Sequence, residues 1–111
     1  MIREVLAVWG LLALAALLES GGDALIRQGL RGARWGLLLG PVALVVYGFV
    51  VNLARWDFNR LMGAYIAVFF LVSQGLAVLL FRERLQAPIL LGGALIVAGG
   101  LVLTFWVPAA K

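Results

Sequence analysis

A chain of 111 residues that is 65% hydrophobic and 13% charged, with a mean hydropathy of +1.12, lacks the polar surface that a water-soluble domain of this size needs. Its net charge of +4 does not indicate nucleic-acid binding, because the arginines are spread over short links instead of gathering on one soluble face. The chain has no cysteine or histidine, so we expect no metal site, no cofactor and no activated serine nucleophile, and hence no enzyme.

Four apolar segments follow one another along the chain, at about 5–26, 35–54, 61–81 and 87–107. Each is close to the roughly 20 residues that a helix needs to cross a hydrocarbon core. A spanning segment has to be a helix or part of a closed barrel, and these runs do not alternate as barrel strands do. The sequence therefore predicts an all-α protein, a single domain of four transmembrane helices in a lipid bilayer.

The first segment carries two carboxylates, Glu19 and Asp23, which lie four residues apart and thus on one helix face. An ionisable group inside a membrane is costly, and this cost favours a functional role. We expect Glu19 to bind a proton or a cation, the alternative being a structural polar contact. Asp23 either forms an ion pair with Arg27, four residues further on, or shares a cavity with Glu19.

The second and third segments contribute aromatic and polar candidates. Tyr65 lies well inside the third segment and is a candidate for the substrate site, because an aromatic ring attracts organic cations. Trp35, Trp56 and Trp106 lie near segment ends, where tryptophan anchors helices at the lipid headgroups. Asn52 is expected to form a hydrogen bond to another helix.

The fourth segment contains two pairs of glycines seven residues apart, Gly92 with Gly99 and Gly93 with Gly100. Each pair returns to the same helix face after about two turns. A stripe of glycines lets a second helix approach closely. This segment is therefore the candidate seam, either between subunits or within one chain.

The basic residues give almost no preference for one orientation in the membrane. One side of the bilayer receives four, and the other receives five from the first and third links. A clear excess of basic residues normally fixes the cytoplasmic side. The near balance favours insertion in both orientations and pairing of two copies as an antiparallel homodimer; the alternative is that another factor fixes the orientation. The four basic residues on the first side are Arg3, Arg55, Arg60 and Lys111.

Two stretches of the chain resemble a known family. The sequence ESGGDALIR at 19–27 resembles the first helix of the small multidrug resistance family, and FRERLQAP at 81–88 with the following glycine-rich helix resembles the end of proteins in the drug/metabolite transporter superfamily. The chain is similar to a divergent member, because residues 67–72 are bulky where the family has glycine, and Asp23 is not a usual residue there.

The resemblance implies a function and a set of residues. It implies an antiparallel homodimer in the cell inner membrane that exports small molecules in exchange for protons, with the two copies of Glu19 forming one shared site. Gly22 and Tyr65 would line this site, and Gly92 and Gly99 would form the dimer seam.

The leading hypothesis is accordingly a proton-coupled transporter of small cationic or amphipathic compounds. Two others stay open: a translocase for lipid-linked carriers or one half of a heteromeric transporter, and an accessory subunit that does not transport.

Overall fold

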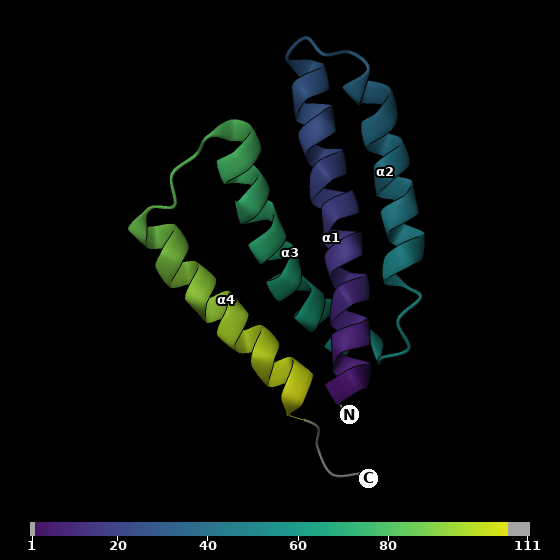
Figure 1. The fold of residues 1–111 in the computed structure, drawn as a ribbon, viewed down its shortest axis with the longest axis vertical. Helices are drawn as coiled ribbons and strands as arrows, with labels where there is room; N and C mark the ends of the chain where they lie inside the picture. The colour runs from purple at the N-terminus through teal and green to yellow at the C-terminus, as the bar shows by residue number, and fades with distance from the viewer. Residues whose placement is uncertain (1, 107–111) are drawn as a thin grey trace.

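Residues 2–106 of the chain are described by a computed structural model, and they form four α-helices joined by short links (Figure 1). The helices are α1 (Ile2–Leu30), α2 (Gly36–Val51), α3 (Phe58–Phe81) and α4 (Ala87–Phe105). Helices satisfy every backbone group within the segment, which apolar runs of this length require in lipid. The predicted all-α architecture is confirmed.

Three of the helices, α1, α3 and α4, are long and apolar enough to cross a membrane. The second, α2, has 16 residues and is about 24 Å long at 1.5 Å per residue. Figure 1 shows α3 beginning at the end of the molecule where α1 begins. The chain therefore has to return through α2 if α1 and α3 both cross the bilayer.

The helix boundaries differ from the expected segments mainly in the first half of the chain. Helix α1 extends four residues beyond position 26 and ends at Leu30. Helix α2 ends at Val51, and the side-chain amide of Asn52, the next residue, donates a hydrogen bond of 2.8 Å to the carbonyl oxygen of Gly48. The expectation that Asn52 bonds to another helix is thus wrong. The expected end of the fourth segment at position 107, and Lys111, lie outside the described residues.

Helices α1 and α2 pack closely because glycines face each other across their interface. A Cβ atom built at Gly22 would lie 2.9 Å from the carbonyl oxygen of Gly40, and one at Gly40 would lie 2.8 Å from that of Gly22. Close backbone approach of this kind is how helices associate in lipid, where no hydrophobic effect drives them together.

The largest buried cluster is built by α1, α2 and α3, without α4. It joins small and branched side chains of α1 and α3 to Val51 of α2. Its remaining members are Leu12, Ala15, Ala16, Leu61, Ala64, Tyr65 and Val68. This three-helix core determines how the polar side chains of α1 meet the aromatic side chains of α3.

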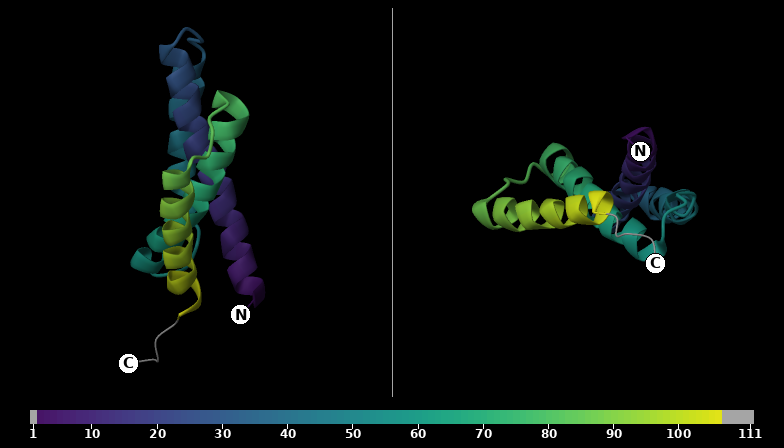
Figure 2. Two further views of the ribbon diagram at one scale, coloured as in Figure 1. Left: turned by 90° about the vertical axis from the view of Figure 1, so that its left-hand side faces the viewer. Right: turned by 90° about the horizontal axis from the view of Figure 1, so that it is seen from below.

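Helix α4 packs on α3 outside this core, and the molecule is thin, with extents of 53 × 34 × 20 Å (Figure 2). Arg60 of α3 holds the C-terminal end of α4, donating from Nη2 to the carbonyl oxygen of Thr104 at 2.6 Å and from Nε to that of Leu103 at 3.3 Å. The guanidinium also lies 3.8 Å from the centre of the Trp56 ring. A cation at a helix C-terminus is favoured by the helix dipole.

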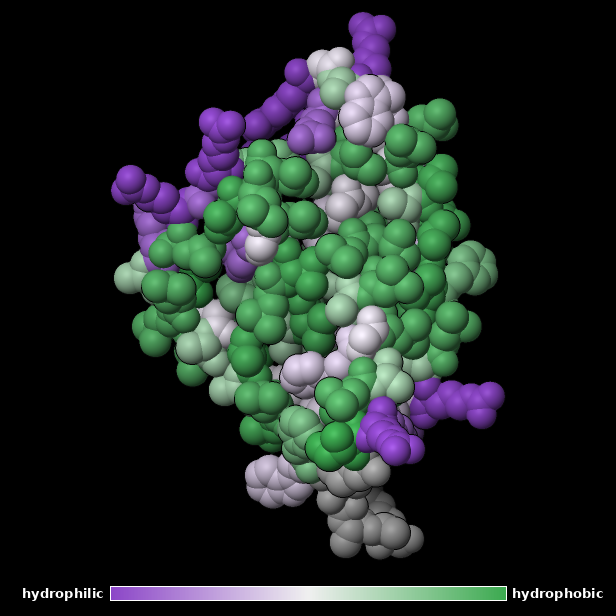
Figure 3. Space-filling model, in the orientation of Figure 1, coloured by the Kyte–Doolittle hydropathy of each residue, from purple (hydrophilic) through white to green (hydrophobic). Residues whose placement is uncertain are grey.

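The surface carries a broad apolar band with charged side chains at its two ends (Figure 3). Leu38, Phe49 and Leu79 are each more than 70% exposed, although they are large apolar side chains. Such a surface is stable against lipid and unstable in water. Together with the three candidate spans, it identifies a multi-pass membrane protein.

We expect Gly40→Ala to lower the free energy of unfolding by about 1–3 kcal/mol, because the new methyl group would collide with the backbone of α1. Gly48→Ala on the same helix is the matched control, since nothing lies within 4 Å of a Cβ atom there. Unfolding in mixed micelles, followed by circular dichroism during a titration with dodecyl sulfate, measures both. Equal stability of the two variants would contradict the packing described above.

Candidate functional site

The carboxylate of Glu19 is bound by a hydroxyl group from another helix. Tyr65 of α3 donates a hydrogen bond of 2.7 Å from its hydroxyl to Oε1 of Glu19 on α1. Tyr65 is buried in the core, whereas Glu19 is half-buried. The small side chains of Ala15 and Ala16, which are fully buried, allow α3 to approach α1 at this level. One polar contact therefore links two helices inside the apolar band.

Aromatic rings surround this hydrogen bond. The ring of Tyr47, on α2, stacks on that of Tyr65 with centroids 5.6 Å apart and planes 30° apart. The ring of Phe69, one turn further along α3, has its centroid 5.9 Å from that of Tyr65. Three rings from two helices thus fix the position of the hydroxyl group that holds Glu19.

Glu19 opens into a cavity of about 300 Å³. Among the residues that the structure describes, the other wall residues are aromatic or aliphatic, and none is basic. An ionised Glu19 would therefore lack a protein cation to neutralise it in this cavity. A proton or an organic cation can supply that charge, and the faces of the aromatic rings attract cations as well. The lining residues are Glu19, Tyr47, Met62, Tyr65, Ile66 and Phe69.

Of the four residues expected at the site, the structure brings together Glu19 and Tyr65. Gly22 is not there: it is buried on the face of α1 that contacts Gly40 of α2, so its small size serves helix packing. This corrects the expectation that Gly22 lines the site. Residue 22 is only about 60° from residue 19 around the helix, so the spacing alone does not separate the two, and the contact with α2 decides the position of Gly22.

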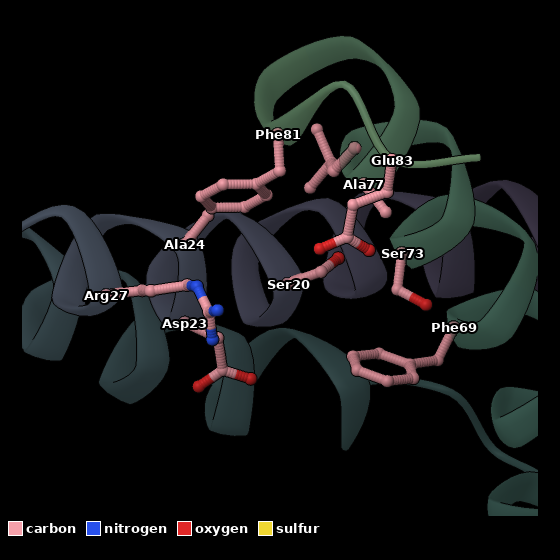
Figure 4. Close-up of a pocket in the computed structure, with 10 residues that line it drawn as sticks. Ser20, Asp23, Ala24, Arg27, Phe69, Ser73, Ala77, Phe81 and Glu83 are labelled. Carbon is pink, nitrogen blue, oxygen red and sulfur yellow. The ribbon is translucent and has the colours of Figure 1, made fainter.

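Asp23 lies one turn from Glu19 and is exposed in a second cavity, whose lining does not include Glu19 (Figure 4). The expected ion pair with Arg27 is not formed among the described residues. The guanidinium of Arg27 lies instead over the ring of Phe81, 5.5 Å from its centroid. This placement lets Arg27 cover an aromatic ring while it keeps its charge at the end of the apolar band.

The four glycines of α4 divide into two pairs with different surroundings. Gly93 and Gly100 are buried against Phe70 and Ala67 of α3, so this pair forms a seam within the chain. Nothing lies within 4 Å of a Cβ atom at Gly92 or Gly99. Among residues 2–106, the second pair therefore has open space where a side chain would lie.

Sequence reasoning missed Tyr47 as a part of the site. It shares no helix with Glu19 or Tyr65, and its residue type is equally suited to helix packing. The only signal in the sequence is that Tyr47, a polar aromatic residue, lies in the interior of an apolar segment. Tyr65 is the other tyrosine of the chain and shares this feature.

The hydrogen bond between Tyr65 and Glu19 should appear as an energetic coupling. We expect a double-mutant cycle of Tyr65→Phe and Glu19→Ala to give a coupling free energy of about 0.5–3 kcal/mol in unfolding, because alanine removes the oxygen that accepts the bond. The cycle of Ser73→Ala with Glu19→Ala is the control, because the Ser73 hydroxyl donates to Phe70 of its own helix. A coupling no larger than that of the control would mean that the bond does not contribute to stability.

Comparison with known proteins identifies relatives that match most of the chain. A UPF0060 membrane protein of Herpetosiphon aurantiacus is 35% identical over 100 residues, which cover 86% of this chain and 91% of the relative. A UPF0060 membrane protein of Nocardia farcinica is 39% identical over 98 residues, covering 86% of this chain and 88% of the relative. No family model matches the chain, and no solved structure does. The relatives' names describe membrane proteins and contain no enzymatic activity. With this identity over nearly the full length of both chains, the protein belongs to the UPF0060 family of membrane proteins.

Proposed function

We propose that the protein is a proton-coupled transporter of small cationic or amphipathic compounds, with Glu19 as the binding site for both proton and substrate. The observation that carries the proposal is a carboxylate within a membrane-spanning helix, held by the Tyr65 hydroxyl and open to a cavity that lacks a basic side chain. Ionisable groups in such places mark ion and substrate pathways.

Competition at one carboxylate supplies the coupling. An ionised Glu19 accepts the hydrogen bond of Tyr65 and attracts a cation to the rings around it. A protonated Glu19 has lost the charge that attracts the cation, so proton binding releases the substrate. The empty, ionised site is the most costly state in a low-dielectric surrounding. The site is therefore expected to reorient across the membrane only when Glu19 carries a proton or a cation. Because one cargo replaces the other, protons and cations move in opposite directions, which is antiport.

The resemblance of residues 19–27 to the first helix of the small multidrug resistance family supports the same function. It also supports a location in the cell inner membrane. The carboxylate that the resemblance assigns to the shared site is the one that Tyr65 contacts.

We propose further that the working unit is an antiparallel homodimer. Helix α4 has an outward face with Gly92 and Gly99, and its neighbours Leu91 and Leu95 are 70% and 69% exposed. A single chain is only 20 Å across in its thinnest direction, and a second copy would complete the walls of the Glu19 cavity. The near balance of basic residues in the links supports insertion in both orientations.

The transport proposal predicts that organic cations displace protons from the wild-type protein. Adding tetraphenylphosphonium, ethidium or methylammonium to unbuffered, detergent-solubilised protein should release up to one proton per Glu19, recorded with a pH indicator dye. Glu19→Gln should abolish the release. Glu4→Gln is the matched control, because Glu4 is an exposed carboxylate in the first turn of the same helix and should leave the release unchanged.

Release that persists in Glu19→Gln would overturn the role of this carboxylate. A wild-type protein that releases no proton with any cation would favour a translocase for lipid-linked carriers or an accessory subunit.

The dimer proposal predicts different effects for neighbouring glycines. Gly99→Leu should convert the dimer to a monomer in light-scattering measurements while the thermal stability of the chain is retained, because residue 99 has open space around it. Gly100→Leu should lower the stability of the chain, because a side chain there would collide with Ala67 of α3. Retention of the dimer in Gly99→Leu would place the subunit contact elsewhere.

A further inference from the structure

A second cavity, of about 270 Å³, lies between α1, α3 and the link that follows α3 (Figure 4). It is formed where both helices approach the end of the molecule opposite the N-terminus (Figure 1). Its polar lining comes from residues far apart in the sequence: Ser20, Asp23 and Arg27 of α1, Ser73 of α3, and Glu83 of the link. The mechanism proposed above does not use any of these side chains.

The formal charges of the residues that line this cavity sum to minus one. Two carboxylates, Asp23 and Glu83, approach from different elements, and Figure 4 shows that the carboxylate of Glu83 points toward Ser20. Arg27 is the one basic residue of the lining, and its guanidinium is placed over Phe81. The cavity therefore has an unbalanced negative charge to offer to a ligand.

The two serines make the cavity selective for ligands that donate hydrogen bonds or carry a positive charge. The hydroxyl of Ser20, which is 7% exposed, donates to the carbonyl oxygen of Ala16, and that of Ser73 donates to the carbonyl oxygen of Phe70. Each hydroxyl has one hydrogen, so its oxygen is left with lone pairs only. Apart from Arg27, every polar side chain of the lining is thus an acceptor.

The cavity adjoins that of Glu19. Phe69 lines both cavities, and Ser20 directly follows Glu19 in the chain. The ring of Phe69 therefore stands between a carboxylate-lined space at the end of the apolar band and the carboxylate inside it.

From this arrangement we infer that the cavity of Asp23, Glu83, Ser20 and Ser73 is an entry site for monovalent organic cations, arranged in series with Glu19. The onward transfer to Glu19 past Phe69 rests on the proposed function, whereas cation selection by the cavity does not. The cation is drawn by the two carboxylates, donates to the acceptor oxygens and lies against the rings of Phe69 and Phe81. Arg27 limits this attraction by supplying the opposing charge.

The absence of cysteine from the chain allows a direct test. A single cysteine introduced as Ser73→Cys is treated, in a neutral detergent, with methanethiosulfonates that carry a trimethylammonium or a sulfonate group. The uncharged methyl reagent corrects for the reactivity of the thiol. A cleft lined by one sign of charge raises the local concentration of counter-ions by at least about tenfold. The cationic reagent should therefore react at least about tenfold faster than the anionic one.

Changes of charge in the lining should move the ratio of the cationic to the anionic reaction rate in both directions. Asp23→Asn combined with Glu83→Gln should bring it close to one, and Arg27→Gln should raise it. Because the second change increases the ratio, a folding defect cannot imitate its effect. Ala54→Cys is the control position, since it lines a cavity at the other end of the molecule that has one acid, Glu4, and one base, Arg55. The ratio there should be near one.

Glu19→Gln separates this inference from the proposed function. The ratio at Ser73→Cys should be unchanged in that variant, even if proton release is lost or was never present. Equal rates for the two charged reagents, no reaction with any reagent, or a ratio that depends on Glu19 and not on Asp23 and Glu83 would each overturn the entry site.

Discussion

A carboxylate inside an apolar bundle needs a hydrogen-bond donor, and this requirement connects α1, α2 and α3. Tyr65 donates to Glu19 from the core of the bundle, and the rings of Tyr47 and Phe69 pack against the ring of Tyr65. The alanines of α1 at the same level let the helices approach closely enough for a bond of 2.7 Å. Close packing of small residues and the position of the polar pair thus depend on each other.

Helix α4 stands apart from this arrangement. It contributes no residue to the largest buried cluster, and it is joined to α3 through Gly93, Gly100 and the contacts of Arg60. The polar groups and the aromatic cavity belong to the other three helices. Because of this division, α4 has an outer face that could contact another subunit without disturbing the cavity of Glu19. This supports one role for α4 and another for the other three helices.

The number and order of the helices could be predicted from the sequence because an apolar run of 20 residues has few alternatives in lipid. The ends were less predictable: α2 stops at Val51, three residues before the end of the apolar segment, and Asn52 bonds back to Gly48 of the same helix. Glu19 could be chosen as a candidate from the presence of a carboxylate inside an apolar segment. Its surroundings depend on how each helix is rotated, and segments that are apolar on all sides do not specify rotation.

The same ambiguity explains the outcomes for the glycines and tyrosines. Seven-residue spacing places Gly92 and Gly99 on one helix face and Gly93 and Gly100 on another. It does not determine which of the two faces contacts α3. Gly22 was assigned to the site from the resemblance, whereas its contact with Gly40 requires knowledge of where α2 lies. Tyr47 joins the site only through stacking on a ring of another helix.

The short length of α2 has a consequence for the lipid around the protein. At about 24 Å, α2 is shorter than the roughly 30 Å of a typical hydrocarbon core, while α1, with 29 residues, is about 43 Å long. Lipid next to α2 has to thin, or to bring its headgroups inward toward Arg34 and Arg55 at the ends of that helix, at a cost of a fraction of a kcal/mol per Å. Helix α2 forms one edge of the molecule and α4, about 28 Å long, forms the other, so the lipid has to adapt most at the edge formed by α2.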